Sequence, residues 1–244
     1  MYYIAGIGDS ITAGVHSEGA GMTYPGQLET MLNKKYPNKY KVTNLGACGS
    51  TMMKGADSPY WKRPQYAALT AAKWDIIIIM LGTNDAKDAG NHGPHNWPHN
   101  CTGAGAHRCP FAADYKSMVD LVRTLGAAPG TAPAIYTAVP PPLMQHGAYG
   151  MNSTVINTVF PDLVRTINAD NKLPGAAIDV FAALGGVPTW PTTFPPNGCT
   201  LNNTNVAKCG YYCEASQKWT CDQCHPDNLG YTEMASTMMA GIGL

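Results

Sequence analysis

The sequence contains few charged residues, and neither sign of charge is in excess. Lysine and arginine together number 16 among 244 residues, aspartate and glutamate also number 16, and charged residues make up only 13% of the chain. Proteins that bind nucleic acid or anionic membranes through charge carry a basic patch or a basic excess. The composition therefore gives no argument for either partner.

Long apolar runs are also missing. The longest covers residues 76–81, whereas a transmembrane helix needs about 20 apolar residues, so we expect no membrane span. No secretory leader is visible, because Met1 opens directly onto an expected strand, and we expect that a leader was removed. A Gly-x-Ser-x-Gly motif is absent as well, which argues against the nucleophile turn of the α/β-hydrolase fold.

Cysteine, by contrast, is plentiful, and most of it lies in two stretches with the composition of loops. The eight cysteines are Cys48, Cys101, Cys109, Cys199, Cys209, Cys213, Cys221 and Cys224. Sequons for N-glycosylation begin at Asn100, Asn152 and Asn202. Disulfide-closed surface loops together with sequons are typical of secreted proteins, so we predict secretion. Eight cysteines allow 105 pairings, and the full pairing stays open.

The chain alternates short β-like runs with amphipathic segments. Expected strands cover residues 2–7, 41–45, 75–81, 134–139 and 176–180, and expected helices cover 24–33, 64–72, 111–125, 155–168 and 229–242. The unbroken isoleucine run of the third strand favours burial on both faces. We predict one α/β domain over 1–244, with a parallel sheet between helical layers and irregular insertions at about 91–109 and 188–223.

Polar clusters follow the first three expected strands. Gly-Asp-Ser follows the first at residues 8–10, a segment beginning at Gly46 follows the second, and Gly-Thr-Asn-Asp follows the third at 82–85. In a doubly wound sheet with strand order 2-1-3-4-5, these strands are neighbours. Their carboxyl ends meet where such sheets bind ligands, which predicts one site around Ser10.

A serine nucleophile needs a base, a carboxylate that orients the base, and donors for an oxyanion. Asp222 and His225 lie three positions apart near the C-terminus, so one loop can hold the carboxylate against the imidazole. The oxyanion donors could be the backbone N–H groups of Ser10 and Gly46 and the side-chain amide of Asn84. Glycine at position 46 would let the backbone approach a substrate closely.

In this order, these segments resemble the four sequence blocks of the SGNH (GDSL-type) hydrolase family, and they span nearly the whole chain. The resemblance implies a three-layer α/β/α flavodoxin-like fold and ester hydrolysis without a cofactor. It also implies that Ser10 is the nucleophile, His225 the base and Asp222 its orienting acid. The oxyanion hole would then contain Ser10, Gly46 and Asn84.

The segment 82–87, together with Asn-Trp at 96–97, is similar to the sialate O-acetylesterase-like and carbohydrate acetylesterase branch. We therefore expect an esterase that removes acetyl groups from a carbohydrate, acting on a small-molecule or oligosaccharide acyl ester. A short-chain lipase or thioesterase is the alternative among enzymes, and a glycan-binding domain of the same fold is the non-catalytic alternative. The oligomeric state stays open, and a monomer is compatible with the sequence.

Three aromatic residues in loops, Tyr60, Trp61 and Trp97, could line a sugar pocket or could pack beneath the loops. Two acids, Asp9 and Asp85, are expected to fix loops by hydrogen bonds rather than to form a second catalytic pair. Neither the aromatics nor these acids are expected to take part in the reaction itself.

Cysteine and histidine also permit metal-binding interpretations. Cys221-x-x-Cys224-His225 matches a c-type haem attachment pattern, and Cys209, Cys213, Cys221 and Cys224 could form a zinc site. The secretory features favour disulfides instead. Four histidines crowd one loop, but no acidic residue lies among them, which favours a polar lid over a metal cluster; they are His92, His95, His99 and His107.

The acid–base pair lies on a stretch with no expected helix or strand, flanked by cysteines. A catalytic pair must be held within about 0.5 Å of its working geometry, and disulfides can supply that rigidity. We therefore predict that Cys221 and Cys224 are both disulfide-bonded. Their partners would come from Cys199, Cys209 and Cys213, and a bond between the two themselves stays open. Cys48 is expected to be structural.

Overall fold

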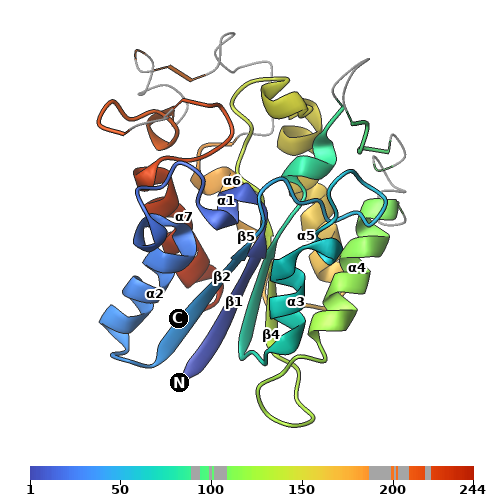
Figure 1. The fold of residues 1–244 in the computed structure, drawn as a ribbon, viewed down its shortest axis with the longest axis vertical. Helices are drawn as coiled ribbons and strands as arrows, with labels where there is room; N and C mark the ends of the chain where they lie inside the picture. Colours follow the sequence, from blue (N-terminus) through green and yellow to red (C-terminus); the bar gives the residue numbers. More distant parts are fainter. Residues whose placement is uncertain are drawn as a thin grey trace.

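A five-stranded parallel sheet forms the middle layer of the molecule (Figure 1). The computed structural model describes residues 1–88, 94–98, 101, 109–186, 199–200, 202, 209–217 and 221–244. The strands are β1 (Tyr2–Gly8), β2 (Tyr40–Gly46), β3 (Ile76–Met80), β4 (Ala134–Val139) and β5 (Ile178–Asp179). They are arranged in the order β2-β1-β3-β4-β5, which confirms the predicted topology.

Helices cover both faces of this sheet. On one face pack α2 (Tyr24–Lys35) and α7 (Asn228–Gly241), and on the other α3 (Pro64–Ala71), α4 (Pro110–Val122) and α5 (Phe160–Asp170) (Figure 1). Two single-turn helices, α1 (Ser10–Ala13) and α6 (Val180–Ala183), directly follow β1 and β5. The sequence did not predict them, because one turn is too short to show a periodicity.

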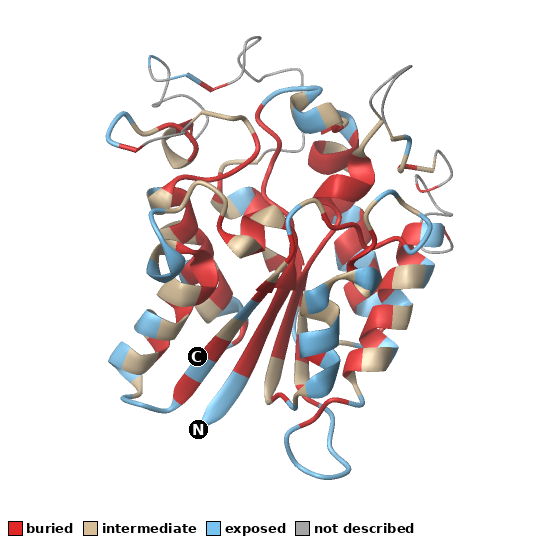
Figure 2. Ribbon diagram, in the orientation of Figure 1, coloured by how far each residue is buried: buried red, intermediate tan, exposed pale blue. Residues whose placement is uncertain are grey.

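The central strand β3 separates two apolar cores. Ile77 and Ile79 belong to the core beneath α3, α4 and α5, whereas Ile78 and Met80 belong to the core beneath α2 and α7. All four side chains are almost completely buried. Figure 2 shows the buried residues along the strands and on the helix sides that face them. The isoleucine run therefore occupies the doubly covered position that its composition predicts.

The helix expected over residues 155–168 begins with a wider turn. Val155–Val159 forms a π-helical turn, in which the Phe160 N–H donates to the Val155 carbonyl oxygen five residues earlier. Pro161 follows at the start of α5 and has no N–H to donate to Asn157. The proline removes one rung of the α-helical ladder, which accounts for the wider turn. None of the helices in the described part of the chain has the length and apolar composition needed to cross a membrane.

The short helix α1 lies tightly against the carboxyl ends of β1 and β2. A Cβ atom at Gly8 would lie 1.9 Å from Thr12 Oγ1, and one at Gly46 would lie 2.1 Å from the Ala13 backbone nitrogen. Neither distance is possible between non-bonded atoms. Glycine at these two positions therefore allows α1 to begin directly above the strand ends, which places Ser10 there.

This packing predicts that Gly46→Ala will destabilise the fold, because the added methyl group meets rigid backbone of α1. We expect the free energy of unfolding to fall by about 1–3 kcal/mol. A Cβ at Gly55 meets no atom within 4 Å, so Gly55→Ala is the matched control and should change stability by less than about 0.5 kcal/mol. Urea unfolding followed by circular dichroism measures both, and equal stability of the two variants would contradict this account.

Candidate active site

Ser10 is the first residue of α1, at the carboxyl end of β1. The preceding Asp9 caps the helix, since its Oδ1 accepts a hydrogen bond from the Ile11 N–H at 2.9 Å. The backbone N–H of Ser10 is among the first N–H groups of the helix, which have no partner within it. Ser10 thus combines a half-buried hydroxyl with a backbone N–H that points out of the helix.

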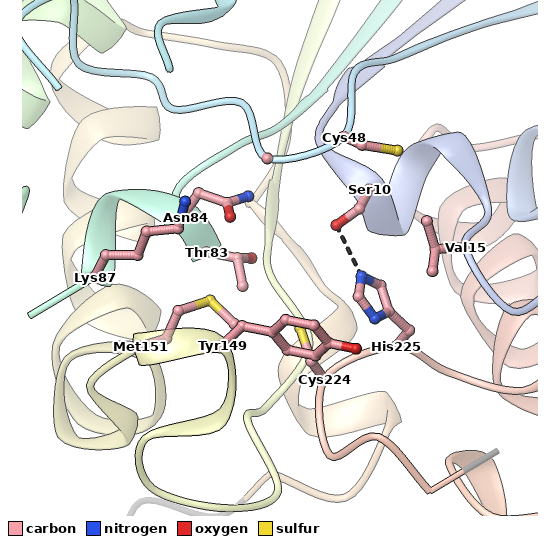
Figure 3. Close-up of a pocket in the computed structure, with 11 residues that line it drawn as sticks. Ser10, Val15, Cys48, Thr83, Asn84, Lys87, Tyr149, Met151, Cys224 and His225 are labelled. Carbon is pink, nitrogen blue, oxygen red and sulfur yellow. Dashed lines mark hydrogen bonds between the residues drawn. The ribbon is translucent and has the colours of Figure 1, made fainter. Parts of the chain in front are cut away.

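The side chains of Ser10, His225 and Asp222 form a continuous hydrogen-bonded chain. His225 Nε2 lies 2.8 Å from Ser10 Oγ (Figure 3), although the two residues are 215 positions apart. The other ring nitrogen, Nδ1, lies 2.5 Å from Asp222 Oδ2. The structure therefore brings together the three residues that the sequence proposed as nucleophile, base and orienting acid.

The carboxylate of Asp222 is also bonded to its own loop. Its Oδ1 accepts the backbone N–H groups of Cys224 at 2.9 Å and His225 at 2.7 Å. Burial alone would raise the pKa of Asp222, but the His225 ring and these two N–H donors lower it to about 2. The carboxylate therefore stays ionised at every pH at which the protein is expected to work.

The disulfides differ in part from the prediction. Three are formed within the described residues, Cys101–Cys109, Cys199–Cys209 and Cys213–Cys221. The prediction for Cys221 is confirmed, including a partner among the three cysteines named, but the prediction for Cys224 is wrong, because Cys224 is a buried free thiol. Cys48 is also free and is exposed.

Gln223 explains why the loop is rigid without a second disulfide. Its side-chain oxygen accepts the Cys199 N–H at 2.7 Å, and its side-chain nitrogen donates to the carbonyl oxygens of Cys199 and Cys221, both at 2.7 Å. Its backbone carbonyl accepts the Met144 N–H at 2.8 Å. These bonds tie the acid–base loop to two other segments, and the side chain of Cys224 is left to face the cavity beside His225 (Figure 3).

The same pairing removes the metal interpretations of the cysteines. Cys209, Cys213 and Cys221 are disulfide-bonded, so they offer no thiolates to zinc, and Cys221 cannot also be attached to haem. Of the four crowded histidines, only His95 falls within the described residues, where it pairs with Asp88 at 2.9 Å. His92, His99 and His107 lie outside them, as do most of the two predicted insertions.

One cluster in the described part of the chain has the ligand types of a metal site: His16, Asp222 and His225. Two ligands bound to one tetrahedral zinc ion at about 2.0–2.2 Å would stand roughly 3.3 Å apart. The 2.5 Å between His225 Nδ1 and Asp222 Oδ2 leaves no room for such an ion. The short separation instead fits a shared proton, and we do not assign a metal to this cluster.

Asn84 lies in the turn Thr83–Ala86 that follows β3. Its side chain is buried, and its Nδ2 donates weakly to Asp9 Oδ2 at 3.4 Å. The side chain of Thr83 donates to the same Asp9 carboxyl group. Asp9 thus fixes the end of β3 to the end of β1, and the Asn84 amide faces Ser10 across the cavity (Figure 3).

The geometry favours Gly49 over Gly46 as a backbone donor. The Gly46 N–H already donates to Asn44 Oδ1 at 2.9 Å, and Gly46 does not line the cavity. Gly49 lines it, has a left-handed backbone with φ of 75°, and its N–H has no acceptor among the described residues. Gly49 lies three positions after Gly46, in the same segment that the sequence identified after the second strand. Gly46 itself packs against α1.

Asp85 holds the segment that carries Gly49. Its two carboxylate oxygens accept the N–H groups of Met52 and Met53, both at 2.8 Å. Burial raises the pKa of Asp85 to about 7 and that of Asp9 to about 6, against the hydrogen bonds that lower them. The expectation that these two acids fix loops is confirmed.

A cavity of about 330 Å³ opens beside Ser10 (Figure 3). It is lined by Ser10, Val15, Cys48, Gly49, Thr83, Asn84, Lys87, Tyr149, Met151, Cys224 and His225. Polar groups gather around Ser10, and the apolar side chains of Val15, Tyr149 and Met151 form much of the remaining wall. Most of these wall residues carry no recognisable motif, so the sequence alone did not single them out.

The three loop aromatics do not line this cavity. Tyr60 is fully buried, and its hydroxyl donates to the Leu45 carbonyl at 2.8 Å. Trp61 donates from Nε1 to the Met52 carbonyl at 2.8 Å. Trp97 packs against Phe111 and Phe160 in the core beneath α4 and α5. Tyr60 and Trp97 are therefore packing residues, whereas Trp61 is half-buried, with Lys54 over its ring.

The chain is similar to known proteins over most of its length. The GDSL-like Lipase/Acylhydrolase family matches residues 7–232. An acetylxylan esterase from Xylanibacter ruminicola is 32% identical over 121 residues, which is 49% of this chain and 22% of that protein. The aligned region thus spans about a fifth of that relative.

Solved structures show the same fold at low sequence identity. An acetylxylan esterase from Geobacillus stearothermophilus is 19% identical with a TM-score of 0.61, covering 100% of this chain and 94% of the other. A carbohydrate acetylesterase family member from Sinorhizobium meliloti is also 19% identical, with a TM-score of 0.59 and 100% coverage of both chains. With the family match across nearly its whole length, this chain belongs to the GDSL-like lipase/acylhydrolase family.

Proposed function

We propose that this protein is a serine esterase that removes short acyl groups, above all acetyl groups, from a carbohydrate. The observation that carries the proposal is the 2.8 Å contact between Ser10 Oγ and His225 Nε2 at the wall of a cavity. A glycan-binding domain needs no such contact. The named activity of the Xylanibacter relative supports the acetyl-ester substrate.

The chemistry begins at Ser10. His225 Nε2 accepts the hydroxyl proton while Ser10 Oγ attacks the carbonyl carbon of the ester, and the carbonyl oxygen becomes an oxyanion. Asp222, ionised because its pKa is about 2, stabilises the imidazolium through the Nδ1–H. The backbone N–H groups of Ser10 and Gly49 and the amide of Asn84 stabilise the oxyanion.

The reaction then proceeds in two stages, formation of an acyl-Ser10 ester and hydrolysis of that ester. The imidazolium gives its proton to the sugar oxygen, the bond between that oxygen and the acyl carbon breaks, and an acyl-Ser10 ester remains. A water molecule then loses a proton to His225 and attacks the acyl carbon. The bond between that carbon and Ser10 Oγ breaks, His225 returns the proton to Oγ, and acetate is released. The protein's own side chains and backbone N–H groups, together with water, supply every group that these steps need.

The location and organisation of the protein follow from the same features. Three disulfides within the described residues support an extracellular, oxidising environment, so we infer that the protein is secreted. Elements from β1 to α7 contribute to one sheet and its two covering layers. This supports a single domain over 1–244.

The first test removes the nucleophile. We expect Ser10→Ala to lower kcat for p-nitrophenyl acetate by about 10⁴-fold or more, because no other group can form the acyl intermediate. Ser117→Ala on the exposed face of α4 is the control and should retain full activity. Thermal unfolding should be similar for both variants, and a Ser10→Ala enzyme with a tenth of the normal activity would refute the assignment.

The second test concerns the oxyanion. Asn84→Ala should lower kcat by roughly 10²–10³-fold with a smaller effect on KM, because the amide binds the charge that develops in the transition state. The loss of the weak bond to Asp9 is checked by thermal unfolding. A raised KM with an unchanged kcat would instead make Asn84 a residue that binds the substrate before reaction.

The third test concerns the acyl group. In a cavity of about 330 Å³ that must also admit part of a sugar, we expect kcat/KM to fall by about tenfold or more from p-nitrophenyl acetate to the butyrate. Acetate release from acetylated xylan checks the natural substrate class. A maximum at hexanoate or longer esters would favour the lipase alternative, and binding of acetylated xylan without acetate release would favour the glycan-binding alternative.

A further inference from the structure

One oxygen atom of Asp222 is contacted by three side chains. Its Oδ2 lies 2.5 Å from His225 Nδ1, accepts the Tyr149 hydroxyl at 2.8 Å and lies 3.2 Å from His16 Nδ1. Only the His225 contact is needed for a serine–histidine–acid chain. His16 follows α1, and Tyr149 comes from the segment after β4, so two distant parts of the chain converge on one carboxylate oxygen.

The rings of His16 and Tyr149 also touch His225 itself. Both meet it nearly edge to face, with ring centroids 5.3 Å from His16 and 5.4 Å from Tyr149. Figure 3 shows Tyr149 extending across the cavity to His225. The two rings thus limit how the imidazole can tilt while it stays in reach of Ser10.

Both residues have a left-handed backbone, with φ of 69° at His16 and 52° at Tyr149. Asparagine, aspartate and histidine adopt this conformation more readily than other residues with a side chain, so Tyr149 is the unusual case. The turn that carries Tyr149 is fixed by two bonds, from the Asp88 N–H to the Gly150 carbonyl at 3.0 Å and from the Asn152 N–H to the Ala86 carbonyl at 2.9 Å. The surrounding structure therefore imposes a strained conformation on Tyr149, as is common beside functional groups.

We propose that Tyr149 and His16 are positioning residues that act through Asp222 to set the pH range in which His225 can serve as base. The proposal rests on the proposed function, since it concerns the base of that reaction. The Tyr149 hydroxyl occupies a lone pair of Oδ2 and takes up part of the carboxylate charge. This bond helps to hold Asp222 against the imidazole of His225. The carboxylate then stabilises the protonated imidazolium less strongly than it would without the extra donor.

Five groups face the His225 ring and decide the sign of the effect. They are Asp222, Asp9, His16, Tyr149 and Cys224. Burial raises the pKa of Tyr149 and of Cys224, so both stay neutral, and neither variant described below touches Asp9.

His16 acts on His225 through its charge. Burial lowers the pKa of His16, so its ring is uncharged at neutral pH, with Nδ1 lying 3.2 Å from Asp222 Oδ2. If it gains a proton at lower pH, its positive charge opposes a second positive charge on His225. Removing either His16 or the Tyr149 hydroxyl should therefore make His225 easier to protonate.

The experiment measures kcat/KM for p-nitrophenyl acetate against pH. Tyr149→Phe keeps the ring and removes the hydroxyl, and we expect the acidic limb of the profile to move to higher pH by about 0.5–1 unit. Each profile is normalised to its own plateau, and below the limb the normalised rate would be about 3- to 10-fold lower than that of the wild type. His16→Asn, which tolerates the left-handed backbone, should move the limb in the same direction.

Tyr136→Phe is the matched control, because Tyr136 does not line the cavity. Its hydroxyl donates to the carbonyl oxygen of Ile242, at the end of α7. Its profile should coincide with that of the wild type. A fall in rate by the same factor at every pH in Tyr149→Phe would mark a merely structural role and would overturn the proposal, as would an unmoved limb.

A second measurement separates this proposal from the proposed function. NMR titration of the His225 ring protons in the Ser10→Ala background reports protonation without any activity, and Tyr149→Phe should raise the midpoint by the same 0.5–1 unit or so. An unchanged midpoint overturns the positioning role, even if the protein is an esterase. Absence of Ser10-dependent hydrolysis in the wild type would refute the esterase, whatever the titration gives.

Discussion

The site depends on two buried carboxyl groups that join the ends of separate strands. Asp9 binds the Ile11 N–H and the side chains of Thr83 and Asn84, so the end of β1 and the turn after β3 move as one body. Asp85 binds the Met52 and Met53 N–H groups, which fixes the segment after β2 to the same turn. Without these bonds, the proposed oxyanion donors would lie on three independent loops, and loops alone hold such donors poorly.

Burial disfavours the charged form of Asp9 and Asp85. The pKa of Asp9 is raised to about 6 and that of Asp85 to about 7, because burial removes both carboxyl groups from water. Asp222 is different, since the His225 ring and two backbone N–H groups outweigh the effect of burial and lower its pKa to about 2. The carboxylate that must stay charged is thus the one given the most donors, while the two that only fix loops tolerate a proton.

The sequence predicts the strand order and brings Ser10, Asn84, Asp222 and His225 to one edge, because strand composition and topology determine where strand ends lie. It fails where a residue has two possible uses. Gly46 packs against Ala13 and does not line the cavity, Cys224 is a free thiol in a loop that Gln223 ties to Cys199, and Tyr60 fills the core. His16 and Tyr149 belong to no motif, and their left-handed backbones follow from packing that sequence patterns do not show.

The wall of the cavity is coupled to the chemistry through a single turn. Met151 and Tyr149 lie on a segment that pairs with Lys87, three residues after Asn84, in a β-bridge between Lys87 and Met151. Tyr149 then reaches from this wall to Asp222. A substrate that displaces the Tyr149 ring would therefore break the hydrogen bond from its hydroxyl to Asp222. The same turn thus forms a wall of the cavity and donates to the carboxylate beside His225.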